Sequence, residues 1–367
     1  MGAMERIPPT ALPWQTAVAE ADGEADMLRY RGVSLDELVG RVPFGPVWGL
    51  LVANDFAVTP PPAERFPLPA HTGDVRADVQ SALALLAPVW GFRPLHDITL
   101  DQARDQLARA SSMTLSFVAQ SARGSDRPVV PQREVDRSDD IVERFLIRWR
   151  GDPDPRDVDA LSAYFVAAAE HGMSPSTVTA RVIASTGADV AACLSGAVGA
   201  ISGPLHGGAP ARAMHMMERI TAGADPGREV ARQLDAGHRL MGFGHTVYRR
   251  EDPRARLLRA TCRRLGSPLC EAAEALEAAA LAALAQRHPE HRIATNMELW
   301  AAVLLHGAGV PTPLFAALFT CARTAGWSAH ILEQAGHVGM RRPVARYVGP
   351  AARPARSVPG WSAMMGA

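Results

Sequence analysis

The sequence contains no lysine, and all 38 of its basic residues are arginine. Aldolases that form a Schiff base, pyridoxal enzymes and Walker-type nucleotidases each depend on a lysine, so the sequence excludes these classes as ordinary interpretations. An arginine-rich genome is a sufficient explanation of this composition. Whatever the reason for the missing lysine, any anion that the protein binds must be held by arginine, histidine or backbone groups.

Cysteine is scarce as well. The four cysteines, Cys193, Cys262, Cys270 and Cys321, include no CxxC pair, which argues against a structural zinc site and is typical of a reducing cytoplasm. No apolar run approaches the roughly 20 residues of a membrane span, and no signal peptide is visible. The formal net charge of +0 gives no reason to expect a nucleic-acid or membrane partner. We therefore expect a cytoplasmic protein whose partners are small molecules.

Alternating strands bounded by turns are few, whereas helix signals recur along the chain. Thr99 and Gln102 form a capping box, and Asp-Pro or Ser-Pro pairs are typical of helix starts. The predicted helices cover 99–124, 154–172, 252–266 and 271–288, and another begins at 174. With 367 residues, 47% of them hydrophobic, the chain is predicted to form an all-α fold of one or two domains.

Two further segments stand out by composition. Residues 180–202 carry Ala, Gly and Ser at many positions, which lets helices approach closely, so this run is predicted to be a central or subunit-interface helix. Residues 336–365 contain too much Pro, Gly and Arg for a packed helix. We expect them to form an extended arm on a surface.

The first candidate site is the loop "SGPLHGGAP". Pro204 and the glycines after His206 shape a loop that presents this histidine ahead of a helix starting near Pro210. The positive end of a helix dipole disfavours imidazolium, so a neutral His206 is able to donate a hydrogen bond to a carbonyl that becomes an enolate. The alternative is a histidine that only fixes its own loop.

The second candidate site is the stretch "MGFGHTVYRREDPRAR", in which His245 follows two glycines. Arg254 falls in the first turn of the next helix, where backbone amides already favour an anion. Its guanidinium adds a planar fork that matches a carboxylate or a phosphate. A solvated basic face explains Arg250 and Arg256 equally well, but it does not explain the glycines.

The third candidate site is "TNMELWAA", which places Glu298 among apolar neighbours. Desolvation raises the pKa of such a carboxyl toward that of a usable general base, although a partly buried helix glutamate often serves only as an ion-pair partner. His171 is predicted at the C-terminal end of its helix, where the dipole stabilises a positive charge. It is either an anion contact or a helix cap.

Together these sites offer a carboxylate, two loop histidines and several arginines, with no lysine and no convincing metal-ligand cluster. That set of groups suits abstraction of a proton next to a carbonyl. Hydrogen bonds would hold the resulting enolate, and arginines would hold the acidic substituents of the substrates.

The motifs "GPLHGGA", "GFGHTVYRREDPRA" and "HGMSPSTVTARVIAST" resemble the citrate synthase family, and the likeness runs from "LRYRG" to "RRPVARYVGP". The resemblance implies an all-α, intertwined homodimer that condenses acetyl-CoA with oxaloacetate. It implies a large domain of residues 1–207 and 310–367 and a smaller mobile domain of residues 208–309. It implies no cofactor, because coenzyme A enters as the thioester substrate.

The resemblance also assigns roles to residues. His206 would hydrogen-bond the thioester enol, His245 would protonate the ketone of oxaloacetate, and Glu298 would be the catalytic base. Oxaloacetate would be bound by His171, Arg254, Arg323 and, from the neighbouring subunit, Arg342. Coenzyme A would be bound by Leu240, Met241, Gly242, Phe243, Gly244 and Arg249.

One position departs from the family pattern. The family's base is an aspartate after "NV", whereas this chain has "NME", which gives Glu298. An added methylene moves the carboxylate by about an ångström, enough to alter the rate unless the backbone compensates. This departure favours a catalytically silent sensor of CoA or citrate as one alternative. A 2-methylcitrate synthase using propionyl-CoA also remains open, because one methylene is worth only about 1–3 kcal/mol of discrimination. The remaining alternatives are a condensing enzyme for another 2-oxo acid and, more distantly, a zinc hydrolase.

Overall fold

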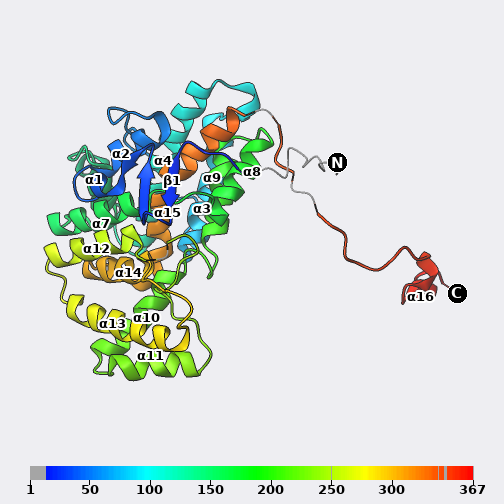
Figure 1. Ribbon diagram of the computed structural model, residues 1–367. Coiled ribbons are helices and arrows are strands. Elements are labelled where there is room, and N and C mark those ends of the chain that lie inside the picture. Colours follow the sequence, from blue (N-terminus) through cyan, green and yellow to red (C-terminus); the bar gives the residue numbers. More distant parts are fainter. Residues whose placement is uncertain (1–13, 249, 338, 343–344, 367) are drawn as a thin grey trace, which may run out of the picture. The chain divides into compact units, whose positions relative to one another are not determined.

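The computed structural model describes residues 14–248, 250–337, 339–342 and 345–366. Trp14–Met340 forms one compact unit, and the segment from Arg341 onward belongs to another. Helices dominate the first unit (Figure 1), so the prediction of an all-α fold is confirmed. One small antiparallel sheet near the start of the described chain was not predicted. Its strands, in the order β1-β2-β3, are β1 (Ala19–Asp22), β2 (Met27–Tyr30) and β3 (Val33–Ser34).

The helices of Trp14–Met340 are connected mostly by short turns. They are α1 (Leu35–Leu38), α2 (Phe44–Ala53), α3 (Val75–Trp90), η2 (Leu95–Asp97), α4 (Leu100–Arg123), α5 (Gln132–Val135), α6 (Ile141–Arg150), α7 (Pro155–Ala168), α8 (Pro175–Ser185), α9 (Val190–Ile201), α10 (Ala209–Thr221), α11 (Pro226–Asp235), α12 (Pro253–Arg264), α13 (Cys270–Arg287), α14 (Met297–Gly307), η3 (Thr312–Leu314) and α15 (Phe315–Ala335). The C-terminal segment contains only η4 (Ala355–Ser357) and α16 (Trp361–Met364) among its described residues.

Local capping explains where the predicted helices begin. The Thr99 side chain accepts from the Gln102 N–H at 3.2 Å, and the Gln102 side chain accepts from the Thr99 N–H at 3.0 Å, which completes the predicted capping box of α4. Asp154 and Asp252 cap α7 and α12 by a single bond each, accepting from the N–H groups of Arg156 and Arg254, and each stands ahead of a proline. These helix starts are confirmed because the signal lies within four residues of the chain.

The predicted end of α7 at Gly172 is wrong, because the helix stops at Ala168. Helix α15 approaches the chain so closely there that a Cβ on Gly326 would lie 2.5 Å from the Ala169 carbonyl oxygen. The Gly326 N–H donates to that oxygen at 3.1 Å. Helix α7 therefore ends where α15 packs against the chain, before Gly172 is reached.

The small-residue run of residues 180–202 is not one helix but parts of two. Residues 186–189 separate α8 from α9, and Gly187 adopts a φ of 80° that favours glycine. Asp189 then caps α9 by accepting from the Ala192 N–H at 2.9 Å. The expected close approach is present nevertheless, because α8 packs against α9 and α9 packs against α3.

Helix α15, orange in Figure 1, runs through the core and is buried along most of its length. It packs against α2, α4, α7, α8 and α9. A helix enclosed in this way holds its polar side chains at fixed positions, and Arg323 is one of them.

Helices α10, α11 and α13 pack against one another, and α10 and α12 both pack against α14. The division into residues 208–309 and the remainder of the chain stays a prediction. All four cysteines are free thiols. No helix in the described part of the chain is both long enough and apolar enough to cross a membrane.

Candidate active site

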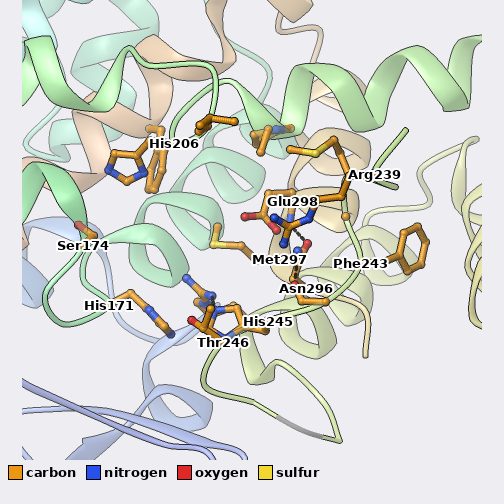
Figure 2. Close-up of a pocket in the computed structure, with 18 of the residues that line it drawn as sticks. His171, Ser174, His206, Arg239, Phe243, His245, Thr246, Asn296, Met297 and Glu298 are labelled. Carbon is orange, nitrogen blue, oxygen red and sulfur yellow. Dashed lines mark hydrogen bonds between the residues drawn. The ribbon is translucent and has the colours of Figure 1, made fainter. Parts of the chain in front are cut away.

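A pocket of about 250 Å³ brings together residues from five separate parts of the chain (Figure 2). The predicted site residues that line it are His171, His206, Leu240, Met241, Gly242, Phe243, Gly244, His245, Arg254, Glu298 and Arg323. Arg342 is exposed and belongs to the C-terminal segment, and Arg249 lies outside the described residues. The roles predicted for these two arginines therefore stay predictions.

The glycines after His206 are required by a close approach of the backbone. The Gly207 N–H donates to the Ile201 carbonyl at 2.9 Å, and a Cβ on Gly207 would lie 2.4 Å from that oxygen. A Cβ on Gly208 would lie 3.0 Å from the Cα of Pro204. The loop thus folds back on itself and presents His206 just before α10, which begins at Ala209.

His206 is a neutral hydrogen-bonding group. Burial, with a smaller contribution from the charge of Arg323, lowers its pKa to about 4. Its Nε2 lies 2.8 Å from the Ser176 hydroxyl oxygen, which also accepts from the Trp327 indole N–H at 3.2 Å. The Ser176 hydroxyl keeps its own proton, and donation of that proton to Nε2 would leave the ring proton of His206 on Nδ1. A neutral imidazole of this kind is able to donate to a developing enolate.

The tautomer of His245 follows from its backbone contacts. The N–H groups of Val247 and Tyr248 both donate to its Nδ1, at 2.9 and 3.2 Å, so the ring proton lies on Nε2. An Arg254 amino group lies 3.2 Å from that same Nε2. This amino group also donates to Asp252, so Nε2 of His245 and the Arg254 guanidinium lie side by side in the pocket lining. Burial first, and then the charge of Arg254, lower the pKa of His245 to about 4.

Arg254 is fixed by a buried carboxylate. Asp252 accepts from the Nε of Arg254 at 3.0 Å and from an amino group at 2.8 Å, and it caps α12 through the Arg254 N–H. Burial alone would lower the pKa of Arg254, but Asp252 more than offsets this and raises it. The same Asp252 accepts from the Met297 N–H at 3.1 Å. It thus joins the N-terminus of α12 to that of α14.

Arg323 is a buried cation, 1% exposed, with neutral hydrogen-bond partners. Its Nε donates to the Ala168 carbonyl at 2.9 Å and an amino group donates to Ser174 Oγ at 3.2 Å. The guanidinium stacks over Phe319 at 4.7 Å. Burial lowers its pKa, and the charge of Glu170 partly opposes this, although no carboxylate of the described residues forms an ion pair with it. A desolvated, unneutralised arginine facing a pocket favours an anionic ligand.

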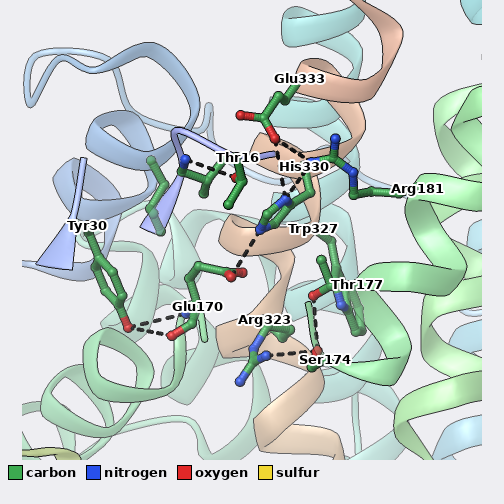
Figure 3. A network of polar contacts seen from close by, with 12 residues as sticks. Thr16, Tyr30, Glu170, Ser174, Thr177, Arg181, Arg323, Trp327, His330 and Glu333 are labelled. Carbon is green, nitrogen blue, oxygen red and sulfur yellow. Dashed lines mark hydrogen bonds and ion pairs between the residues drawn. The ribbon is translucent and has the colours of Figure 1, made fainter. Parts of the chain in front are cut away.

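A buried polar network lies behind Arg323 (Figure 3). Arg181 donates to Nδ1 of His330 at 3.0 Å, so the His330 proton lies on Nε2, which donates to Glu170 at 3.0 Å. Tyr30 contacts the same turn by accepting from the Glu170 N–H at 3.2 Å. The network holds α15 against the end of α7 and so fixes the distance between Arg323 and the turn that carries His171.

The surroundings of His171 disfavour the positive charge expected at a helix C-terminus. It lies in the turn after α7, and its Nε2 is 3.0 Å from the Tyr248 hydroxyl. Its ring meets that of His245 edge-on at 5.1 Å. Burial, followed by the charges of Arg254 and His245, holds its pKa well below the ordinary value. The dipole argument is wrong here because desolvation and neighbouring cations outweigh it.

The loop that carries Gly242 and Gly244 is tied to the chain just before α14. Phe243 and Thr295 form an antiparallel bridge, flanked by hydrogen bonds from Gly244 N–H to the Ala294 carbonyl at 2.8 Å and from Asn296 N–H to the Gly242 carbonyl at 2.9 Å. Gly242 has a φ of 95°, a conformation that strains other residues. The segment predicted to bind CoA is therefore held in register with Glu298.

Glu298 lies in the first turn of α14, where Asn296 caps the helix by accepting the Glu298 N–H at 3.2 Å. Burial raises the pKa of its carboxyl, and the charge of Arg254 partly opposes this. Its Oε2 has no hydrogen-bond partner within the described chain. A carboxylate that faces a pocket with an open oxygen and a raised pKa has the properties of a general base.

Sequence reasoning missed three contributors to this pocket. Tyr248 contacts both His171 and His245, and Ser176 orients His206. The contacts of Tyr248 with His171 and of Ser176 with His206 have no local signal, because the partners are 77 and 30 residues apart in sequence. Asp252 was recognised only as a helix cap, and its contact with Met297 was invisible for the same reason.

The comparisons with known proteins agree with this geometry. Residues 11–346 match the family model "Citrate synthase, C-terminal domain". The chain belongs to the citrate synthase family. A Mycobacterium tuberculosis protein named "Putative citrate synthase 2" is 58% identical over 95% of this chain and 94% of its own length. The 2-methylcitrate synthase of Shewanella oneidensis is 30% identical over 91% of this chain and 92% of its own length.

A solved structure of citrate synthase from Thermoplasma acidophilum, a ternary complex with carboxymethyl coenzyme A and oxaloacetate, superposes with a TM-score of 0.76. The two chains are 25% identical over 93% of this one and 95% of the other. Citrate synthases need no metal or cofactor. Within the described residues, no group of three or more His, Cys, Asp or Glu side chains is placed to hold a metal ion.

Proposed function

We propose that this citrate synthase family member condenses acetyl-CoA with oxaloacetate in the pocket around Glu298, releasing citrate and CoA. The observation that carries the proposal is that one cavity gathers an open carboxylate oxygen, three histidines whose pKa is lowered, and three arginines. The 58% identity to the mycobacterial protein and the match to a complex with both kinds of ligand support it. The 2-methylcitrate synthase alternative has the weaker support of a 30% identical relative.

In this proposal the arginines and His171 bind oxaloacetate. Arg323 offers an unneutralised guanidinium to a carboxylate, and Arg254 offers the donors that Asp252 leaves open. The ketone oxygen would accept from Nε2 of His245 and from the Arg254 guanidinium, whose nearest nitrogen lies 3.2 Å from that Nε2. The backbone of residues 240–244 contributes the site for CoA.

The reaction then needs only protein groups. Glu298 takes a proton from the methyl group of the acyl-CoA while His206 donates a hydrogen bond to the thioester oxygen, which stabilises the enol. The enol carbon attacks the ketone carbon of oxaloacetate, and the Nε2 proton of His245 passes to the ketone oxygen. Water then hydrolyses the new thioester, so that CoA leaves as the thiol and citrate is released.

The proposal also includes the assembly and setting of the enzyme. A homodimer would let Arg342 of one subunit complete the oxaloacetate site of the other. Four free thiols suit a reducing cytoplasm, where the enzyme would serve the tricarboxylic acid cycle.

Loss of thioester absorbance tests the reaction, with purified protein, oxaloacetate and either acetyl-CoA or propionyl-CoA. We expect faster loss with acetyl-CoA. Faster loss with propionyl-CoA would identify the protein as a 2-methylcitrate synthase. The two rates must be compared directly, because one methylene is worth only about 1–3 kcal/mol of discrimination between the two thioesters. Loss of thioester absorbance only with a 2-oxo acid other than oxaloacetate would show that this other acid is the second substrate. No loss with any pair, in a protein that still binds CoA, would favour the sensor.

A further inference from the structure

A second cavity, of about 230 Å³, lies between α4, α6 and the proline-rich loop of residues 59–63. We call it the α4–α6 cavity. Its lining shares no residue with the candidate active site. The proposed condensation makes no use of it.

Two buried arginines on α6 line this cavity. Arg144 and Arg148 are 8% and 7% exposed, and their spacing of four residues places both on one face of the helix. Arg144 is neutralised by Asp136 and also donates to the Ser138 carbonyl at 2.9 Å. Arg148 donates to the neutral amide oxygen of Gln132 at 2.7 Å.

Arg148 forms no ion pair with a carboxylate in the described part of the chain. Burial, and then repulsion from Arg144, lower its pKa, and the charge of Asp136, which is paired with Arg144, partly opposes this. Burying a cation without an ion-pair partner of its own is costly, and the cost falls when an anion enters. Asp139 also lines the cavity, but it is exposed and makes no hydrogen bond or ion pair with either arginine.

The opposite wall belongs to α4 and the loop. Ser112 donates to the Pro61 carbonyl and so fixes the prolines over the cavity. Ser116 accepts from Gln120 at 3.1 Å, which leaves the Ser116 hydroxyl proton available to a ligand. Leu115 and Phe145 supply the apolar part of the lining. A compact ligand with a charged end would contact both the polar and the apolar parts of the lining.

We propose that the α4–α6 cavity is a second anion-binding site, which takes a compact oxyanion, a phosphate or a small carboxylate, on Arg148 and Ser116. The planar guanidinium matches either group through paired hydrogen bonds. The site is separate from the proposed reaction, so either proposal can fail without the other.

Equilibrium dialysis with radiolabelled inorganic phosphate tests the site in the full-length protein. Phosphate also binds to the active-site arginines, so the informative quantity is the difference between variants. We expect Arg148→Gln to bind one phosphate fewer per chain at millimolar phosphate, with condensation activity retained. The matched control is Arg133→Gln, because Arg133 is 84% exposed on the adjacent α5 and lies outside the cavity lining. It should bind phosphate like the wild type.

Ser116→Leu provides an independent test, because it fills the cavity and leaves both arginines in place. It should remove the same phosphate, and it decides the matter if Arg148→Gln does not fold. Competition with succinate separates the two ligand classes: displacement of this phosphate identifies a carboxylate site, and retention identifies a phosphate site. If folded Arg148→Gln and Ser116→Leu bind phosphate and succinate as the wild type does, the proposal is wrong.

Discussion

Glu298 gives the sharpest test of the catalytic site, because this chain carries a glutamate where the family has an aspartate. If Glu298 is the working base, Glu298→Gln removes the only group that takes the methyl proton. General acid–base catalysis contributes typically about 10²–10⁴-fold, and we expect kcat to fall by this amount. Binding of oxaloacetate should change little, because its proposed ligands are Arg254, Arg323 and His171.

The effect of Glu298→Asp follows from how the start of α14 is held. Asn296 N–H donates to the Gly242 carbonyl at 2.9 Å, and Met297 N–H donates to Asp252 at 3.1 Å. These contacts prevent the backbone from advancing to meet the substrate. A side chain shorter by one methylene then stops about an ångström short, and such a misplacement costs on the order of 10²-fold in rate.

Two assays measure the prediction: deuterium uptake from solvent into the methyl group of acetyl-CoA, which reports proton removal alone, and loss of the thioester, which reports turnover. Glu290→Gln is the matched control, since Glu290 is an exposed glutamate shortly before the same helix. Wild-type turnover in Glu298→Gln would show that another group takes the proton. A marked gain in Glu298→Asp would show that the base is correct but that the native site is compromised, which would favour the sensor or another substrate.

Three further predictions concern the other groups. Arg254→Lys keeps the charge but loses the planar fork, so the KM for oxaloacetate should rise on the order of 10- to 100-fold, and an unchanged KM would remove Arg254 from the substrate site. Mixing inactive Arg342→Ala and His245→Ala proteins should restore part of the activity through heterodimers. If subunit exchange is confirmed and no activity returns, Arg342 does not act across the interface. The folded pKa of about 4 for His206 and His245 lies below the ordinary value of about 6.5, so between these pH values the unfolded chain binds more protons. The free energy of unfolding should therefore fall as pH drops from about 6.5 to 4, and the His206→Gln variant should show a smaller fall in thermal unfolding experiments.

Much of the fold follows from signals that lie within a few residues of the chain. The capping box at Thr99 and the Asp-Pro pairs before α7 and α12 each fix a helix start, and these predictions are confirmed. Helix ends were less predictable. Helix α7 ends where α15, from near the other end of the chain, packs against Ala169. The small-residue run of residues 180–202 is instead interrupted locally, at Gly187.

The candidate site divides in the same way. The sequence shows two histidines next to glycines, His206 and His245, and Arg254 in the first turn of a capped helix. They can be recognised because close backbone turns need particular residues at particular positions. The structure brings His206, His245 and Glu298 to one pocket, while their chemical roles stay predictions. Two protonation states expected from the sequence, the neutral ring of His206 and the raised pKa of Glu298, agree in direction with the structure, with burial as the main cause of both. The expectation failed where burial opposed the local signal. His171 shows this most clearly: its local position suggested a cation, yet its buried surroundings favour the neutral ring.

Asp252 explains why two substrate sites and a base can share one small pocket. Its carboxylate accepts from Arg254 at the start of α12 and from Met297 at the start of α14. The residue after Met297 is the proposed base, so the ketone-binding arginine and the proton-abstracting carboxylate have a common support. Catalysis of a two-substrate condensation depends on the relative position of these groups to within about an ångström. A single buried aspartate, fully enclosed, meets that demand more directly than separate supports on separate helices would.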